Sequence, residues 1–590
     1  MFEILKRKVP IPGAIRLAML VFGLFGVGFG TSSHAQEVPS TVDPGQIERD
    51  LRGSREPIRV QPTNPEFGIT QEVPDIPDGA ENISFVLEQV SFTGVKSVYS
   101  DEELLGDFKS RIGQEVTVAE LFEAAAQMSA RYRNSGYLLS SVIVPAQEID
   151  SGAVIFQVIE GHVDQLMLDA ERVSEKYPEV VRRYLDKILL EKPLTRLTLE
   201  RYLLLANDLP GISVSSFIQP SNTSVGAATL TVKLAPVASQ PLVRLDNRGT
   251  KFVGPYQLEA SGSIDALKLG DSRLDARVIT APGEGRELNY ASIGYMQEQD
   301  AEGTAIEVGL NAMRAEPGEE LRNLALKLEA YGVSVSARSK IIRSRATNLT
   351  LATSFSWNNS ETRALDALLF KDSARTLNVS ADFSMVDRFS GVNTLIAGVS
   401  KGLSAFGATA AFDPLASKSD AEPDATWLNL TGVRYQDLGP WLPRASAVAT
   451  VSMQYSFDPL SSSREFGVGG RANGSAFDPA EITGDHGLSG RLEFRYDMSV
   501  PDDVPINQNK YIKINNMQPY SFVDGGAVWH DEGEATGQQH DRISSAGLGA
   551  RFSFSRGFSG TIEIAKPYGK TIASEGDREP RIFVELSALF

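Results

Sequence analysis

Residues 242–590 carry one repeated pattern, in which apolar and polar side chains alternate along extended segments. The alternation is clear at 348–357, 376–385, 447–457 and 491–498. A period of two residues is typical of β-strands, because successive side chains point to opposite faces. A sandwich of roughly 100 residues would not use this much chain. At roughly 20–22 residues per strand and connection, the region predicts about sixteen antiparallel strands, an even number that closes into a transmembrane β-barrel without a free edge.

The last ten residues, 581–590, form a strand of the same kind. Phe590, Leu586 and Val584 lie on its apolar face, and about ten residues are enough to cross a bilayer as a tilted strand. Alone, the segment fits a C-terminal strand of a soluble sheet equally well. A terminal aromatic residue on the apolar face resembles the sorting signal of bacterial outer-membrane barrels. The resemblance implies that these three residues serve barrel assembly.

The N-terminus has the features of a secretory signal peptide. Basic residues precede the apolar run 17–30, which is short for a bilayer span, and small residues lead to Ala35. We expect removal of residues 1–35, so that the mature chain begins at Gln36. The 590 residues contain no cysteine, which favours passage through an oxidising periplasm and excludes disulfide scaffolds and thiolate metal sites. No later apolar run approaches the roughly 18 residues of a transmembrane helix.

Between the two ends, the pattern changes to strands mixed with helices. Ser-x-x-Glu at 100–103 and Thr-x-x-Glu at 117–120 are capping boxes that open two helices. The order β-α-α-β-β then repeats, which predicts two small α+β modules at 80–161 and 162–236. Residues 36–79 are rich in proline and polar side chains and indicate a linker with one short helix, from about Gln46 to Leu51.

The two modules resemble POTRA (polypeptide-transport-associated) domains. The order of signal peptide, short helix, linker, two POTRA domains and barrel (240–590) resembles the TpsB transporters of two-partner secretion, within the BamA-like superfamily. The motifs that carry the resemblance are NSGY at 134–137, DNRG at 246–249, FGVGG at 466–470, YSFVDGGAVW at 520–529 and AKP at 565–567. The resemblance spans nearly the whole mature chain and implies a barrel in the cell outer membrane with its POTRA domains in the periplasm.

The resemblance also implies a lid loop, residues 458–489, with an arginine at its tip. This chain has Ser475 at the corresponding position, and Arg471 is the only arginine near the tip. The alternation points the carboxylate of Asp524 into the lumen, because lipid does not accept an unpaired charge. The hypothesis is therefore that Arg471 pairs with Asp524 and holds the lid. The predicted latch consists of Arg471, Asp524, Gly469, Gly470, Ser475 and Phe477.

A second arrangement of the latch is equally open at this stage. Asp524 can instead pair with Arg491 or Arg495 of the preceding strand. In either case the glycines of the FGVGG segment allow tight turns inside a narrow pore.

The sequence lacks the motifs of the common enzyme classes. It contains no HExxH, nucleophile-elbow or phosphate-loop motif, and the histidines after the signal peptide show no metal-ligand spacing. We therefore expect no enzyme activity, cofactor or metal. The net charge of −18 argues against nucleic acid as a partner, because phosphates would be repelled.

The resemblance implies a pore that secretes a large haemolysin-like or adhesin-like partner exoprotein in unfolded form, with the POTRA domains capturing this client in the periplasm. The alternative is an outer-membrane assembly factor of the BamA or TamA type. A passive porin is disfavoured, since solute diffusion needs no polypeptide-binding domain. The other expected partners are outer-membrane lipid and lipopolysaccharide, the barrel-assembly machinery and periplasmic chaperones, and the chain is expected to be monomeric.

Overall fold

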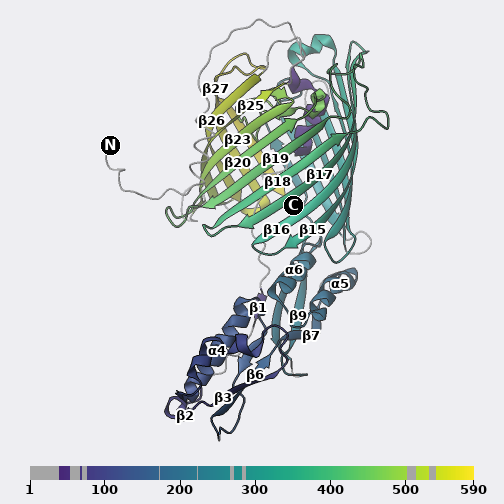
Figure 1. The fold of residues 1–590 in the computed structure, drawn as a ribbon. Coiled ribbons are helices and arrows are strands. Elements are labelled where there is room, and N and C mark those ends of the chain that lie inside the picture. Colours follow the sequence, from purple (N-terminus) through teal and green to yellow (C-terminus); the bar gives the residue numbers. More distant parts are fainter. Residues whose placement is uncertain are drawn as a thin grey trace, which may run out of the picture.

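The molecule consists of a β-barrel and an elongated arm of two small domains below it (Figure 1). The computed structural model describes residues 39–53, 67–69, 76–149, 151–171, 173–221, 223–265, 271–281, 287–500, 513–530 and 540–590. The predicted signal peptide, with its cleavage site at Ala35 and Gln36, lies outside the described residues. Within them, every helix is too short or too polar to span a membrane.

The barrel is a closed antiparallel sheet of sixteen strands in the described part of the chain. The strands are β10 (Leu242–Asp246), β11 (Gln257–Asp265), β12 (Ser272–Ala281), β13 (Leu288–Glu298), β14 (Thr304–Ala315), β15 (Lys327–Arg343), β16 (Thr347–Ala364), β17 (Ala367–Val386), β18 (Gly391–Gly402), β19 (Thr426–Asp437), β20 (Ala445–Ser456), β23 (His486–Tyr496) continued by β24 (Met498–Ser499), β25 (Ile514–Trp529), β26 (His540–Phe554), β27 (Phe558–Tyr568) and β28 (Arg581–Leu589). β28 pairs with β10, so the sheet has no free edge. The predicted fold class is confirmed.

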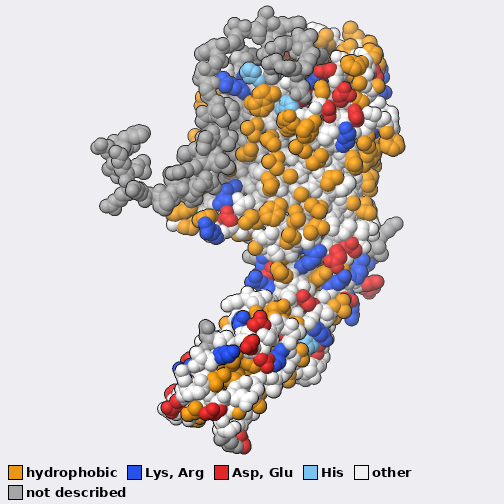
Figure 2. All heavy atoms as spheres, viewed as in Figure 1, with side chains coloured by type: hydrophobic (Ala, Val, Ile, Leu, Met, Phe, Trp, Pro, Cys, Tyr) orange, Lys and Arg blue, Asp and Glu red, His pale blue; other side chains and the backbone are white. Residues whose placement is uncertain are grey.

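The alternation along the strands separates the outer face of the barrel from its lumen. On β25, Val523 and Trp529 are exposed on the outside, whereas Phe522 and Asp524 are buried inside. Figure 2 shows apolar side chains spread over the outer face of the barrel, with charged side chains gathered towards its two ends and on the arm. An apolar outer band is what a barrel needs in order to contact lipid.

The first small domain is a mixed α+β module. It contains η2 (Ala80–Asn82), β2 (Ser84–Val86), β3 (Gln89–Gly94), α3 (Asp101–Leu105), η3 (Gly106–Arg111), β4 (Glu115–Thr117), α4 (Val118–Asn134), β5 (Ser141–Ile143) and β6 (Ala153–Ile159). Ser100 and Thr117 cap α3 and α4 through the two predicted capping boxes. β3, β6 and β5 form one sheet, and β2 pairs with β4. The core lies between this sheet and α4, where Tyr132 and Phe156 are fully buried.

The second small domain has the predicted order β-α-α-β-β. Its elements are β7 (His162–Asp169), α5 (Lys176–Leu190), α6 (Arg196–Asn207), β8 (Ile212–Pro220) and β9 (Ala227–Pro236). Tyr184, Leu185 and Leu203 of the helices are buried against Leu230 and Val232 of β9. A short strand from the linker, β1 (Phe67–Ile69), is added to the edge of the sheet beside β8.

Ion pairs fasten the second domain to the lower end of the barrel. The carboxylate of Asp208, just after α6, lies 3.0 Å from Lys340 Nζ and 2.7 Å from Arg343 Nη2 at the end of β15. Glu302, in the turn after β13, accepts hydrogen bonds from Lys187 Nζ at 2.8 Å and from the Tyr202 hydroxyl at 3.1 Å. Burial raises the pKa of Asp208, but the two cations outweigh it and hold that pKa below its ordinary value.

Candidate functional site

The lid occupies the lumen of the barrel. It lies between β20 and β23 and contains η5 (Ser462–Arg464), β21 (Phe466–Val468) and β22 (Ile482–Gly484), with β21 and β22 paired as a hairpin. The hairpin contacts β25, and β22 also contacts β26. Buried lid and wall side chains form one apolar cluster that includes Phe477, Ile482, Phe522, Ile543 and Phe583. The lid is therefore packed against the inner wall instead of resting above the pore.

The tip of the lid is bound to Asp524, which is 1 % exposed. The Ser475 hydroxyl donates a hydrogen bond to Asp524 Oδ2 at 2.6 Å, and the Ser475 backbone N–H donates to the same oxygen at 3.1 Å. Arg491 stands opposite Asp524 on β23, and its Nη1 lies 2.9 Å from that oxygen. The lid thus supplies a neutral donor to the carboxylate, and the barrel wall supplies the cation.

Arg471 lies elsewhere, against the last strand. Its Nη1 is 2.5 Å from Glu585 Oε2 on β28, and its side chain is 40 % exposed. The hypothesised pair between Arg471 and Asp524 is therefore replaced by the alternative pair with Arg491. The physical reason is the turn at the tip, where Gly469 and Gly470 adopt positive φ angles of 133° and 75°. This turn leads Arg471 towards β28 before the chain returns to place Ser475 at β25.

The wall around the latch carries alternating charges. Glu493 accepts from Arg491 Nη2 at 3.0 Å and from Arg551 Nη1 at 2.7 Å. Glu563 accepts from Arg248 Nη2 at 2.9 Å and from the Tyr520 hydroxyl at 2.6 Å. Each buried charge in this group has a partner of opposite sign, which is the condition under which buried ions are tolerated.

The DNRG motif closes the barrel next to this network. Asn247 Nδ2 donates to the Ile582 carbonyl at 2.9 Å, and its Oδ1 accepts from the Val584 N–H at 2.7 Å. Its neighbour Arg248 belongs to the charged network. Motifs that lie more than 300 residues apart in the sequence therefore meet where β28 returns to β10.

A helix from the N-terminal segment also fills the lumen. α2 (Pro44–Gly53), preceded by η1 (Ser40–Val42), is the purple ribbon inside the barrel in Figure 1. Val42, Ile47 and Leu51 pack against inner-wall residues such as Tyr290 and Met313. The sequence predicts this helix but assigns it to a linker. Ile47 and Leu51 lie four residues apart on one face of this helix. This apolar face is the signal in the sequence that the helix packs against another surface, because a free linker offers nothing against which it can pack.

The helix and the lid contact each other. Gln46 Nε2 donates to the carbonyl of Glu465 at 3.2 Å, and the Ser40 hydroxyl donates to the carbonyl of Ala480 at 2.7 Å. On the other side of the helix, Asn311 Nδ2 donates to Glu48 Oε1 at 2.9 Å. α2 and the lid therefore form one connected obstruction.

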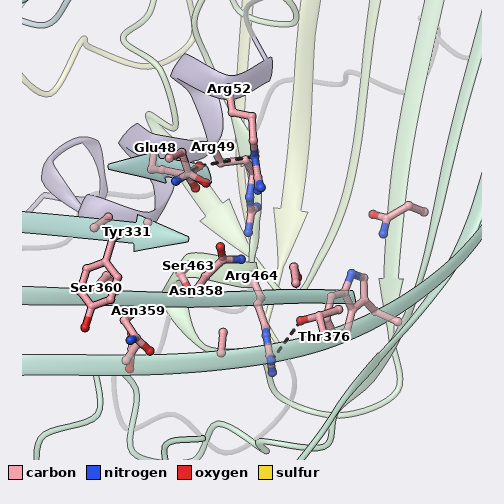
Figure 3. Close-up of a pocket in the computed structure, with 18 of the residues that line it drawn as sticks. Glu48, Arg49, Arg52, Tyr331, Asn358, Asn359, Ser360, Thr376, Ser463 and Arg464 are labelled. Carbon is pink, nitrogen blue, oxygen red and sulfur yellow. Dashed lines mark hydrogen bonds and ion pairs between the residues drawn. The ribbon is translucent and has the colours of Figure 1, made fainter. Parts of the chain in front are cut away.

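A cavity of about 290 Å³ remains between α2, the lid and the wall. Figure 3 shows Arg49, Arg52 and Arg464 in this cavity, opposite polar wall residues such as Asn358 and Thr376. The volume is at the lower end of the roughly 300–1,000 Å³ of small-molecule pockets. The cavity therefore lies where α2 and the lid meet the wall inside the barrel.

One group near the base of the lid has the composition of a metal site. Ligand atoms of Glu465, Asp485 and His530 lie within 4.8 Å of one another. However, Lys418 Nζ lies 3.1 Å from Glu465 Oε1 and 3.0 Å from Asp485 Oδ2. The ammonium group already supplies the positive charge, so the described residues form an ion cluster that joins the lid to the loop between β18 and β19.

The residues predicted to serve barrel assembly lie on the outer face of β28. Leu586 and Val584 are exposed on this strand, and Phe590, the residue after its end, is 72 % exposed. We expect deletion of Phe590 to lower the amount of heat-modifiable barrel in outer-membrane fractions several-fold, because the last strand loses its recognised end. Phe590→Tyr, which keeps the aromatic ring, is the matched control and should assemble normally. Unchanged barrel levels after deletion would contradict the assignment.

Comparisons with known proteins identify the family. Residues 238–552 match the family described as haemolysin secretion/activation protein ShlB/FhaC/HecB, and residues 85–161 match the POTRA domain of ShlB type. The heme/hemopexin transporter protein HuxB of Haemophilus influenzae strain 86-028NP is 23 % identical over 546 residues, which cover 90 % of this chain and 92 % of HuxB. HuxB of strain Rd is 22 % identical over 548 residues, with the same coverage of 90 % and 92 %.

Solved structures show the same fold at low sequence identity. CdiB from Escherichia coli has a TM-score of 0.73 and 16 % identity, and the match covers 95 % of this chain and all of that one. CdiB from Acinetobacter baumannii has a TM-score of 0.65 and 14 % identity, with coverage of 94 % and 100 %. The chain belongs to the ShlB/FhaC/HecB family of haemolysin secretion/activation proteins, outer-membrane barrels with periplasmic POTRA domains that secrete a partner exoprotein.

Proposed function

We propose that the chain secretes a large exoprotein, of the haemolysin or adhesin kind, in unfolded form through the lumen of its barrel. The observation that carries the proposal is the double obstruction of the lumen. α2 and the lid are held by side-chain contacts to each other and to the wall, so both can leave without unfolding a barrel strand. A passive porin does not require α2 or the lid in its lumen. A pore wide enough for a polypeptide must be closed between clients.

The POTRA domains capture the client in extended form by β-augmentation. Adding a strand to a sheet edge supplies main-chain hydrogen bonds without demanding one particular sequence, which suits an unfolded passenger. In the first domain, β3 and β5 are the edge strands of the sheet. In the second domain, the ion pairs of Asp208 and Glu302 hold its sheet beneath the barrel.

Transport needs no nucleotide in this proposal. Folding of the client outside the cell draws the chain forward, and the residues of the transporter bind and release it without catalysing a reaction. The remaining partners that we propose are outer-membrane lipid and lipopolysaccharide around the barrel, and periplasmic chaperones and the barrel-assembly machinery during biogenesis.

The test is co-expression with a candidate exoprotein, chosen as a large secreted protein encoded by a neighbouring gene. We expect that exoprotein in the culture medium only when the transporter is present. A client variant with an internal disulfide-closed loop should stall and be released by reductant, because a looped segment does not pass as a single extended strand. If the exoprotein reaches the medium without this chain, or if the looped variant is secreted as fast as the unlooped one, the proposal is wrong.

A further inference from the structure

The loop between β27 and β28, residues 569–580, lies at the end of the barrel away from the arm. β10 comes directly after the second small domain, and its first residue, Leu242, pairs with Leu589 at the end of β28. The start of β28 and the loop before it are therefore at the opposite end of the barrel. Because the POTRA domains are periplasmic, this end faces the outside of the cell.

The loop turns inward and buries one apolar side chain against the lid. Ile572 is fully buried, in the same apolar cluster as Phe477 and Ile482 of the lid. Two hydrogen bonds within the loop shape this turn. The Ile572 N–H donates to the carbonyl of Asp577 at 2.8 Å, and the Gly576 N–H donates to the carbonyl of Ile572 at 2.8 Å. The loop is therefore packed against the lid instead of extending into solvent.

Hydrogen bonds join the same loop to the lid. The Ala573 N–H donates to Glu481 Oε1 at 2.6 Å, and the Ser574 hydroxyl donates to Asp478 Oδ2. Arg581, the first residue of β28, donates from Nη1 to Asp478 Oδ1 at 2.8 Å. Both carboxylate oxygens of the buried Asp478 are thus bound, one of them in a charge-assisted hydrogen bond.

This second anchor of the lid is separate from the one at Asp524. Ser475 is bound by Asp524 of β25 together with Arg491 of β23, whereas Asp478 is bound by β28 and the loop before it. Asp478 follows Ser475 by three residues, so one short segment of the lid is fastened to two different parts of the barrel.

We propose that residues 569–580 form a strap that holds the lid in the lumen from the outer end of the barrel, with Asp478 as the lid residue that the strap and β28 bind. Lys570, at the base of the strap, pairs with Asp541 of β26 and fixes the strap to the wall. β27 and β28 are paired along the sheet without the strap, so the strap can move away from the lid while the barrel stays closed. The inference goes beyond the proposed function, since it requires no particular client.

A single thiol tests the strap. The chain has no cysteine, so Ala476→Cys introduces the only one, at a fully buried position of the lid. We expect a membrane-impermeant maleimide to label this thiol slowly in assembled barrels, and about tenfold faster when Ile572→Asp is added, because an apolar cluster does not tolerate an ionised carboxylate. The matched control is Thr571→Asp, which adds the same charge at the adjacent exposed position and should leave the labelling rate unchanged.

The ion pair at the end of the strap gives a second measurement. Arg581→Gln should speed the labelling several-fold and raise the resting conductance in planar bilayers. Arg578→Gln, at an exposed position of the strap, is the control and should change neither. Because Arg581 Nη1 lies 2.8 Å from Asp478 Oδ1, Arg581→Gln should have a smaller effect in an Asp478→Asn background than alone.

The outcomes separate the strap from a general loss of stability. Unchanged labelling of heat-modifiable barrels that carry Ile572→Asp overturns the inference, and so does equal acceleration by Ile572→Asp and Thr571→Asp. Ile572→Val keeps an apolar side chain and should label as slowly as the parent, whereas Ile572→Ser gives the same test if the aspartate variant does not assemble. Absence of the exoprotein from the medium with the parent chain contradicts the proposed function and leaves the strap standing.

Discussion

Replacing Asp524 with alanine is expected to detach the tip of the lid and, because the loss of a buried ion pair destabilises the barrel wall, to lower secretion of the partner at least tenfold. The substitution removes the carboxylate 2.9 Å from Arg491 Nη1, so that Arg491 keeps only the carboxylates of Glu493 and Glu563, and it removes the acceptor of both Ser475 hydrogen bonds. Breaking a buried pair by removing one partner costs about 3–5 kcal/mol. The measurements are the amount of exoprotein in the medium, the resting conductance in planar bilayers and the temperature at which the barrel unfolds on gels.

Arg471→Ala is the matched control for this prediction. Its pair with Glu585 is partly exposed, and exposed pairs contribute about 0.2–1 kcal/mol, so secretion should stay close to that of the parent chain. Arg491→Ala should resemble Asp524→Ala, and the double variant should lose less than the sum of the two. If Arg471→Ala is as damaging as Asp524→Ala while Arg491→Ala is not, the lid is held by Arg471 and the present assignment is wrong.

A charge exchange gives a further check on the same pair. Arg491→Asp combined with Asp524→Arg should restore part of the secretion that either single variant loses. Restoration stays partial, because Arg491 also lies 3.0 Å from Glu493 and 3.5 Å from Glu563, and an aspartate at that position would face both.

Deleting residues 80–234 is expected to reduce secretion below detection, because every POTRA sheet edge that could receive the client is removed. The barrel strands all follow this segment and should still close, so heat-modifiable barrel in the outer membrane is the required second measurement. Substantial secretion by an assembled barrel without these residues would contradict client capture by the POTRA domains.

A spacer variant tests whether the POTRA domains bind the client or act only as spacers. Replacing residues 80–234 with a flexible glycine- and serine-rich segment keeps the chain connected but supplies no sheet edge. We expect it to fail as completely as the deletion. If it secretes normally, the two domains act as spacers only.

The period-2 alternation, together with the length of chain over which it recurs, was sufficient to predict the barrel. The alternation reflects a local property, the direction of successive side chains on a strand. That property does not depend on what the strand packs against. For the same reason the sequence placed Asp524 in the lumen and its neighbour Val523 on the outside, and both predictions agree with the structure. The capping boxes of α3 and α4 are equally local, since donor and acceptor lie three residues apart.

Contacts between distant segments could not be predicted in this way. The partner of Asp524 was open between Arg471 and an arginine of β23, and the choice depends on where the turn at Gly469 and Gly470 leads the lid. The sequence by itself determined which faces of the strands are apolar and where the two capped helices of the first small domain begin. Only the tertiary structure decided that α2 enters the pore, that Arg491 meets Asp524 and that β1 joins β8, because these contacts depend on the closure of the barrel and on the position of the linker, which no local pattern encodes.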